Sequence, residues 1–245
     1  MNRFYCPDPK ILDDFLFLDD KKTLHHIKRV LCLKPGEQVT VFDAKGAEYL
    51  CFIENIKDEV CLKIKDKVTL HKQISGIKLT VACAIPKNCR FDDIVDKLCQ
   101  LGVYRIIPLV TERVIVKLDT KKERLKLERW RKIIKSSAQQ SQRSVLPLFD
   151  DITSLEDLLK QVNCFDLKII PTLAGERSLL REVIPAVKEN ISILVLIGPE
   201  GDFSDGEIEK CRKNGFIPVS LGRNVLRVDT AAIATAGFIL FYANR

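Results

Sequence analysis

The sequence predicts an α/β protein of two domains, a small β-rich domain followed by a larger domain built on a parallel sheet. Residues 1 to about 72 contain short strands with alternating apolar and polar residues. After residue 76 the chain alternates continuous apolar strands with amphipathic helices. That alternation is typical of a parallel sheet covered by helices on both faces. We therefore expect domains at residues 1–72 and 73–245.

The first domain is expected to be a small β-barrel-like sheet. The stretches QVTVFD and EYLCFIENI flank Ala44-Lys45-Gly46, which has the composition of a hairpin turn. EVCLKIKDKV then alternates in the manner of a half-buried strand. KTLHHIKRVLCL, before these strands, predicts a helix, and LHKQISG at 70–76 predicts the linker to the second domain.

In the second domain, apolar spacing places the helices. FDDIVDKLCQLG has its apolar residues at i, i+3, i+4 and i+7, and Gly102 follows at the position that often ends a helix. The longest predicted helix buries a stripe from Trp130 to Ser141. Strands are expected at 77–85, 104–110, 167–173, 192–198 and 217–221, and helices at 91–102, 121–142, 179–188, 204–214 and 229–243.

Composition excludes several classes of protein. Hydrophobic residues make up 46% and charged residues 30%, as in ordinary globular proteins. No apolar run reaches the ~18 residues of a transmembrane helix, and the first residues lack the apolar core of a signal peptide. The nine cysteines contain no C-x-x-C pair, which favours free thiols over zinc ligands or disulfides. We expect a cytoplasmic protein without a metal or a membrane partner.

The positive charge is concentrated in the middle of the chain. The net charge is +7, of which residues 73–150 contribute +8, the residues before them +1 and the residues after them −2. A local positive field indicates a polyanionic partner. A solvated, lysine-rich helix face explains the same pattern equally well.

Two glycine-containing stretches follow predicted strands near the C-terminus. LIGPEGDFSD spans 196–205 and LGRNVLRVDTA spans 221–231. Ligands of open α/β sheets bind outside the carboxyl ends of strands, and glycines there let the backbone approach a ligand closely. Neither stretch is a dinucleotide fingerprint or a P-loop. Each one alone is also an ordinary turn from strand to helix.

Together, the two stretches resemble the C-terminal signature of the ribosomal RNA (uracil-N3) methyltransferases of the SPOUT class. That signature runs roughly I-G-P-E-G-G-F-S, then L-G-x-R-I-L-R-x-E-T-A. KLCQLGVYRIIPLVTERVIVK, RWRKIIKSSAQQSQRSVLP and the N-terminal RFYCP with LHHIKRVLCLKPGEQVTVFD are also similar to the family, in the same order. Departures from its pattern are Asp202 for the second glycine, Asn224 for arginine, Asp229 for glutamate, Gln100 for glutamate and Cys32 for arginine.

The resemblance implies a fold and an activity. The fold is a SPOUT-type parallel sheet with a C-terminal trefoil knot, preceded by a PUA-like RNA-binding β-barrel. The cofactor is S-adenosyl-L-methionine, and the reaction is methylation of uridine N3 in 16S rRNA, in the decoding region of the 30S subunit. The family also implies a homodimer. Alternatives are a SPOUT methyltransferase acting on tRNA or 23S rRNA, and a non-catalytic RNA-binding or assembly factor.

The chemistry assigns roles to individual residues. Adenine calls for apolar walls and backbone groups, and the uridine anion calls for a hydrogen-bond donor. Arg227 is the expected stabiliser of that anion, and Glu200 is a weak candidate for the base. A structural ion pair would account for Arg227 as well, and a carboxylate that stabilises a helix N-terminus would account for Glu200.

The expected cofactor residues are Leu173, Ile197, Gly198, Glu200, Gly201, Leu221, Gly222, Val225 and Leu226. The expected RNA-binding residues are Arg3, Lys28, Arg29, Arg113, Gln139, Gln142 and Arg143.

Overall fold

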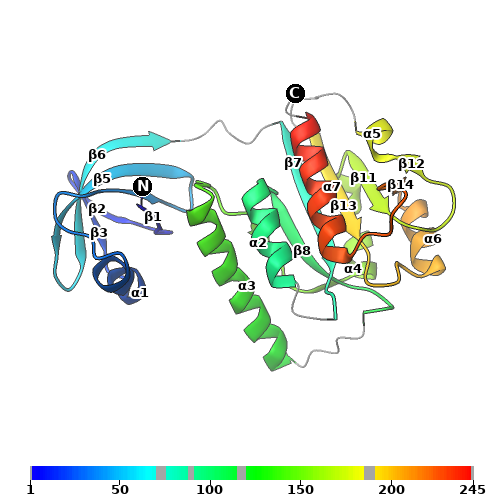
Figure 1. The fold of residues 1–245 in the computed structure, drawn as a ribbon, viewed down its shortest axis with the longest axis horizontal. Coiled ribbons are helices and arrows are strands. Elements are labelled where there is room, and N and C mark those ends of the chain that lie inside the picture. The colour runs from blue at the N-terminus through cyan, green and yellow to red at the C-terminus, as the bar shows by residue number, and fades with distance from the viewer. Residues whose placement is uncertain (1, 70–75, 88–90, 115–119, 185–190, 244–245) are drawn as a thin grey trace. The chain divides into compact units, whose positions relative to one another are not determined.

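A computed structural model describes residues 2–69, 76–87, 91–114, 120–184 and 191–243. The chain divides into two compact units, Met1–Gln73 with Ala138–Leu146, and Ile74–Ser137 with Pro147–Arg245. Figure 1 shows the elements of each unit. The expected linker at 70–76 lies, except for its last residue, outside the described part of the chain.

The first unit is a six-stranded sheet with a short helix. Its order is β1-β4-β5-β6-β3-β2, with β1 parallel to β4 and all other neighbours antiparallel. Alternate residues of these strands point inward and form one apolar core with Ile27. The elements are β1 (Asn2–Tyr5), β2 (Lys10–Leu12), β3 (Phe15–Leu18), α1 (Lys21–His25), η1 (His26–Val30), β4 (Gln38–Phe42), β5 (Ala47–Ile56) and β6 (Val60–Thr69).

The predicted hairpin between β4 and β5 is confirmed. The two strands pair antiparallel, and Gly46 in the turn has a φ of +81°. The buried carboxylate of Asp43 accepts hydrogen bonds from the backbone N–H groups of Lys45 (2.8 Å) and Ala47 (2.9 Å). The turn is therefore fixed by a local side-chain acceptor as well as by a glycine.

The second unit is built on a parallel sheet, as predicted. Its order is β10-β8-β7-β13-β11-β14-β12, with β9 also pairing with β8, and every described pair is parallel. Its strands are β7 (Ile77–Ala84), β8 (Arg105–Val110), β9 (Leu148–Phe149), β10 (Thr153–Ser154), β11 (Leu167–Pro171), β12 (Ser178–Leu179), β13 (Ile191–Ile197) and β14 (Ile217–Ser220). Its helices are α2 (Phe91–Leu101), α3 (Thr120–Gln140), α4 (Leu155–Leu159), η2 (Val162–Cys164), α5 (Leu180–Val183), α6 (Asp205–Lys213) and α7 (Val228–Ala243).

Helices cover both faces of the central strands. Residues of α4 and α6 pack against alternate residues of β7, β8, β11 and β13 in one core. α2 and α7 lie side by side, and α7 contacts β7 and β13 (Figure 1). Because β7 and β13 are covered on both faces, they are apolar except near their first residues, where Lys78, Thr80 and Ser192 lie.

Several elements differ from the sequence prediction. The helix expected at 179–188 is a single turn, Leu180–Val183, and residues 185–190 of that expectation lie outside the described residues. The helix expected at 121–142 ends at Gln140, since Gln142 has a φ of +58°. No sequence pattern predicted β1, β2, β3, β9, β10, β12, α4 or η2, most of which are too short to show a clear period.

Candidate functional site

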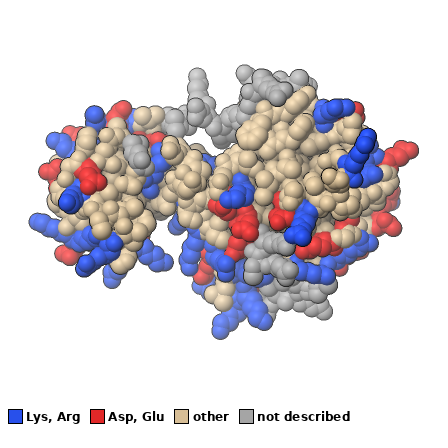
Figure 2. Space-filling model, in the orientation of Figure 1, with Lys and Arg blue, Asp and Glu red and all other residues tan. Residues whose placement is uncertain are grey.

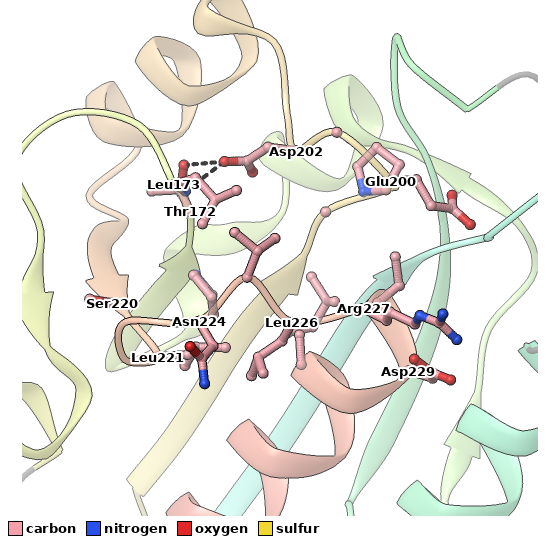
Figure 3. Close-up of a pocket in the computed structure, with 18 of the residues that line it drawn as sticks. Thr172, Leu173, Glu200, Asp202, Ser220, Leu221, Asn224, Leu226, Arg227 and Asp229 are labelled. Atoms are coloured by element: carbon pink, nitrogen blue, oxygen red, sulfur yellow. Dashed lines mark hydrogen bonds between the residues drawn. The ribbon is translucent and has the colours of Figure 1, made fainter.

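Three neighbouring strands of the second unit end at one edge of the sheet. β11 lies between β13 and β14, and all three are parallel. Their last residues are Pro171, Ile197 and Ser220, and the loops that follow enclose a pocket of about 470 Å³ (Figure 3). Pockets of roughly 300–1,000 Å³ are typical of small-molecule sites.

The expected cofactor residues all meet at this pocket. Gly198 and Gly222, which end different strands, both line it, and so does Arg227. The remaining lining residues on this list are Leu173, Ile197, Glu200, Gly201, Leu221, Val225 and Leu226. The structure therefore brings the two glycine stretches of the sequence, and the end of β11, around one cavity.

Gly198 has no room for a side chain. A Cβ at this position would lie 3.0 Å from ring carbons of Phe203 and 3.3 Å from Oδ1 of Asp202. The ring of Phe203 is buried in the core formed with α4 and α6, so a shift of a few tenths of an ångström away from such a Cβ would press it against that core. Glycine lets the backbone after β13 pass beneath this ring without such a shift.

The loop after Gly198 is a tight turn. The backbone N–H of Asp202 donates to the carbonyl of Pro199 at 3.0 Å. Gly201, at the third position of the turn, has a φ of +90°, which corresponds to a type II turn and favours glycine. Asp202 follows with a φ of +68°, a region that aspartate and asparagine enter more readily than other side chains.

The carboxylate of Asp202 joins this turn to the end of β11. Its Oδ2 accepts hydrogen bonds from the hydroxyl of Thr172 (2.7 Å) and the backbone N–H of Leu173 (2.6 Å), as Figure 3 shows. Its Oδ1 accepts from the backbone N–H of Phe203 at 2.8 Å. Two walls of the pocket are thus held together by one side chain.

The third wall is the loop from Leu221 to Arg227. Gly222 has a φ of +122°, and its N–H donates to the hydroxyl of Ser220 at 3.3 Å. Val225 lines the pocket and is 74% exposed, which is unusual for a large apolar side chain. The carbonyl of Arg227 accepts from the N–H of Ala231 (2.8 Å) and so starts α7. This wall therefore leads directly into a buried helix.

Charged side chains of both signs line the pocket. The carboxylates are Glu200, Asp202 and Asp229, and the guanidinium groups are Arg177 and Arg227. Arg177 donates to the carbonyl of Thr172 at 3.1 Å. Figure 3 shows Arg227 and Asp229 next to each other at the start of α7. Carboxylates outnumber guanidinium groups here, so the lining suits a ligand that carries positive charge.

A thiol lies behind the pocket, at the end of β7. Cys83 is fully buried, and its backbone pairs with Ile197. Burial raises the pKa of the Cys83 thiol, and the nearby carboxylates of Glu200 and Asp229 raise it further. The thiol is therefore protonated at neutral pH and does not act as a nucleophile. Among the residues that the structure describes, no group of three His, Cys, Asp or Glu side chains is placed to hold a metal ion.

The expected RNA-binding residues fall into different settings. Arg113 is exposed and donates to the carbonyl of Gly201 and, at 3.4 Å, to that of Asp202. Arg3 has a side chain only 7% exposed, and it is paired with Glu48 (2.5 Å). Arg113 thus braces the turn after β13, and Arg3 stabilises the first unit.

The other expected RNA-binding residues lie in the first unit. Lys28 and Arg29 are exposed on η1, and Lys28 donates to the carbonyl of Lys57. Gln139, Gln142 and Arg143 lie at and just after the end of α3, in the segment Ala138–Leu146. Gln142 is exposed, whereas Gln139 and Arg143 are half-buried.

Several residues that line the pocket were not among the site residues predicted from the sequence. Thr172, Arg177 and Ser220 line it, as do Pro86 and Pro199. Thr172 and Ser220 each come directly after or at the end of a strand, which is a signal that the sequence contained. Asp202 was noted only as a departure from the family pattern, and its role as an acceptor emerges from the geometry.

Comparison with known proteins gives consistent matches over the chain. Residues 73–240 match the family described as RNA methyltransferase domain, and residues 18–65 match the RNA methyltransferase PUA domain. The chain is 30% identical to ribosomal RNA small subunit methyltransferase E of Bacillus subtilis, over 86% of this chain and 84% of the relative. It is 33% identical to the protein of the same name from Mesomycoplasma hyopneumoniae, over 95% and 96%.

Solved structures agree with these relatives. A putative methyltransferase from Legionella pneumophila, in complex with the bound cofactor SAM, matches with a TM-score of 0.86 and 33% identity, covering 97% of this chain and 96% of that one. Ribosomal RNA small subunit methyltransferase E from Neisseria gonorrhoeae, bound to S-adenosyl methionine, matches with a TM-score of 0.86 and 27% identity, covering 99% and 98%.

Proposed function

This chain belongs to the ribosomal RNA small subunit methyltransferase E family, and on that premise we propose that it methylates N3 of a uridine in the decoding region of 16S rRNA. The methyl donor is S-adenosyl-L-methionine, and the substrate is the RNA of the small ribosomal subunit. The observation that carries the proposal is the pocket at the ends of β11, β13 and β14, which gathers both glycine stretches. No helix in the described part of the chain is long and apolar enough to cross a membrane. We place the enzyme in the cytoplasm, with the ribosome.

The pocket residues fit the donor. Ile197, Leu221, Val225 and Leu226 offer apolar walls for the adenosyl group, and the loop backbones offer hydrogen-bonding groups. When bound, S-adenosyl-L-methionine supplies an electrophilic methyl group on a cationic sulfur. The surplus of carboxylates over guanidinium groups in the lining favours that cation.

The acceptor chemistry sets requirements on the RNA. N3 lies on the Watson–Crick edge of uracil, so the base must be unpaired or extruded from its stack before it can react. A carbon–nitrogen bond forms at N3 as the methyl carbon–sulfur bond breaks, and the electron pair of that bond stays on sulfur. The proton of N3 leaves to a base.

Arg227 is the residue we assign to stabilise the uracil anion. Its guanidinium lies at the pocket, beside Asp229 at the start of α7 (Figure 3). A fixed cation there can donate to O2 or O4, where negative charge develops as N3 loses its proton. Glu200 is exposed, lines the same pocket and is the candidate proton acceptor.

A basic surface supports an RNA substrate. Figure 2 shows Lys and Arg side chains gathered over α3, in the part of the chain that carries the positive excess. The exposed basic residues of α3 are Lys121, Lys122, Arg124, Arg129, Arg131, Lys132 and Lys135. We propose the exposed cations of α3, in the second unit, as RNA-binding residues, since phosphate contacts need exposed cations. In the first unit we propose Lys28, Arg29, Gln139, Gln142 and Arg143. Arg113 is exposed and stays a candidate, whereas Arg3 is left out, because its side chain is only 7% exposed and is paired with Glu48.

We also propose that the enzyme is a homodimer formed through α7. Ala234, Phe238 and Phe241 are at least partly exposed on one face of this helix, and Phe241 is 66% exposed. Next to them, a groove of about 370 Å³ is lined by Leu179, Leu180, Leu221 and Leu226 among others. It shares Ser220, Leu221, Gly222 and Leu226 with the main pocket. An apolar face of this kind is typical of a subunit interface.

The C-terminal trefoil knot stays a prediction from the family.

The test is the modified nucleoside in the cell. Mass spectrometry of 16S rRNA from a strain lacking the gene should find unmethylated uridine at the decoding-region site, and a plasmid copy should restore 3-methyluridine. Persistence of 3-methyluridine in the deletion strain would contradict the proposal.

A further inference from the structure

Resting on the proposed function, we infer that Asp202 is a positioning residue that sets the affinity for the methyl donor by tethering two walls of its pocket. Asp202 sits in the left-handed region, at φ +68°, where a glycine would be free of strain.

The geometry of the carboxylate supports a tether. Oδ2 accepts two hydrogen bonds from the chain after β11, at 2.7 Å from the Thr172 hydroxyl and 2.6 Å from the Leu173 N–H. Oδ1 accepts one from Phe203 in its own loop. The hydroxyl of Thr172 in turn accepts from the N–H of Ala174 at 3.1 Å, so the donor of the first bond is itself oriented.

The tethered segment needs such a support. Leu173 forms part of the pocket wall, yet its side chain is 53% exposed, so packing alone holds it weakly. The backbone N–H of Leu173 already donates a hydrogen bond to Asp202, so it does not donate to a ligand. On the other side, Arg113 binds the carbonyls of Gly201 and Asp202. The turn is thus hydrogen-bonded both to the chain after β11 and to Arg113 in the absence of a ligand.

Pre-organisation of this kind acts on affinity. A wall that is ordered in the free protein does not have to be ordered when the ligand binds, so less free energy is lost on binding. Removing the tether should weaken binding of the donor and of the demethylated product alike, because both contact the same wall. It should leave the rate of methyl transfer at saturating donor nearly unchanged.

The experiment compares two substitutions at this position. Asp202→Gly removes the acceptor and keeps the backbone free of strain, and calorimetry should show Kd for S-adenosyl-L-methionine rising about tenfold or more. Asp202→Asn keeps one oxygen for the Thr172 and Leu173 donors, loses the acceptor for the Phe203 N–H, and should restore part of the affinity. Asp205→Asn, a nearby exposed carboxylate outside the pocket, is the control and should bind as the wild type does. Circular dichroism verifies that each variant is folded.

Two further readouts separate the tether from other effects. Amide hydrogen exchange at Leu173 should be slow in the wild type and in Asp202→Asn, and fast in Asp202→Gly. Thr172→Val, combined with Asp202→Gly, should weaken binding by less than the sum of the single effects, because both remove the same contact. Wild-type affinity in Asp202→Gly, or an Asp202→Asn variant as weak as Asp202→Gly, would overturn the inference. If the wild type itself fails to bind the donor, the proposed function fails, and exchange at Leu173 still decides whether the tether exists.

Discussion

At the scale of single residues, the pocket depends on where side chains are missing as much as on where they are present. Gly198 passes beneath Phe203, and Gly201 allows the turn that presents Glu200 and Asp202. Arg227 then adds a second cation, beside Arg177, to a lining that also holds three carboxylates.

Arg227→Ala should lower turnover while leaving the affinity for S-adenosyl-L-methionine largely intact. The expected loss in kcat is about 10²–10³-fold, the usual effect of removing one donor to a developing anion. Steady-state methylation of small-subunit RNA gives kcat, and calorimetry gives the affinity. Arg223→Ala is the matched control, since Arg223 is an exposed arginine of the same loop that does not line the pocket. Unchanged turnover in Arg227→Ala would reject the assigned role.

Gly198→Ala should abolish donor binding and destabilise the protein by about 1–3 kcal/mol, the range for overpacking a filled site. The added methyl group meets the buried ring of Phe203 at 3.0 Å. Gly206→Ala is the control, because its Cβ would lie 3.8 Å from the Ser204 hydroxyl, an ordinary contact, in the first turn of α6. Denaturant unfolding and calorimetry give the two quantities. Equal behaviour of the two variants would contradict the steric argument.

At the scale of elements, parallel pairing is what turns distant sequence stretches into one site. β13 follows β11 in the chain, yet it lies between β11 and β7 in the sheet. This order puts the loops after β11, β13 and β14 beside one another, and α7 starts at the last of them. α7 then carries the exposed apolar face that we assign to the dimer.

Phe241→Asp should convert the dimer to a monomer, because a carboxylate cannot be buried in an apolar interface without a partner. Analytical ultracentrifugation measures the change. Leu12→Asp, an equally drastic substitution of an exposed apolar residue in the first unit, should leave the mass unchanged. A wild type that sediments as a monomer would refute the proposed interface.

The first unit should become less stable in acid through Glu48. Burial alone would raise the pKa of Glu48, but hydrogen bonds from Arg3 and Ser144 outweigh it and hold that pKa below its usual value. A lowered pKa in the folded state means that the carboxylate stabilises the fold above its unfolded pKa of about 4.3. This stabilisation is lost as pH falls through the folded pKa.

Glu48→Gln tests this dependence. Its melting temperature should lie below that of the wild type at pH 7, where it also leaves Arg3 without its charge partner. The difference should shrink as pH is lowered through the pKa of Glu48. Glu54→Gln, an exposed residue of the same strand, is the control. A difference that stays constant with pH would show that Glu48 does not titrate as described.

The sequence predicted the elements that have a long amphipathic period or a long apolar run, and it missed the short ones. α2 repeats its apolar residues over several turns, whereas α7 and the central strands are nearly continuous apolar runs. β9, β10 and β12 have two residues each, so they show no period at all and form only because a neighbouring strand offers them partners.

The same limit applies to the site. The glycines and apolar walls were predicted, because strand ends and a family resemblance indicated them. The bonds from Thr172 and Leu173 to Asp202 join residues 29 and 30 positions apart in the sequence, so no local pattern signals them. Arg3 and Arg113 were expected to bind RNA because they are basic, and only the fold reveals the acceptors that engage them.

At the scale of the whole molecule, we propose that each unit contributes a different part of the reaction. The second unit holds the proposed donor pocket and the basic residues of α3, and the first unit contains the residues that match the PUA domain and the remaining proposed RNA contacts. The division into domains at 1–72 and 73–245 stays a prediction that separate expression of the two segments would test. Methyl transfer to a ribosomal uridine needs both functions, a donor site and a polyanion-binding surface.

The most direct measurement is methyl transfer by the purified protein from methyl-deuterated S-adenosyl-L-methionine to separate pools of small subunits, large subunits and tRNA. Nucleoside mass spectrometry should find deuterated 3-methyluridine in the small-subunit pool alone when the subunits come from a strain lacking the gene. Label in tRNA or in large subunits, or label on an atom other than N3, would contradict the account.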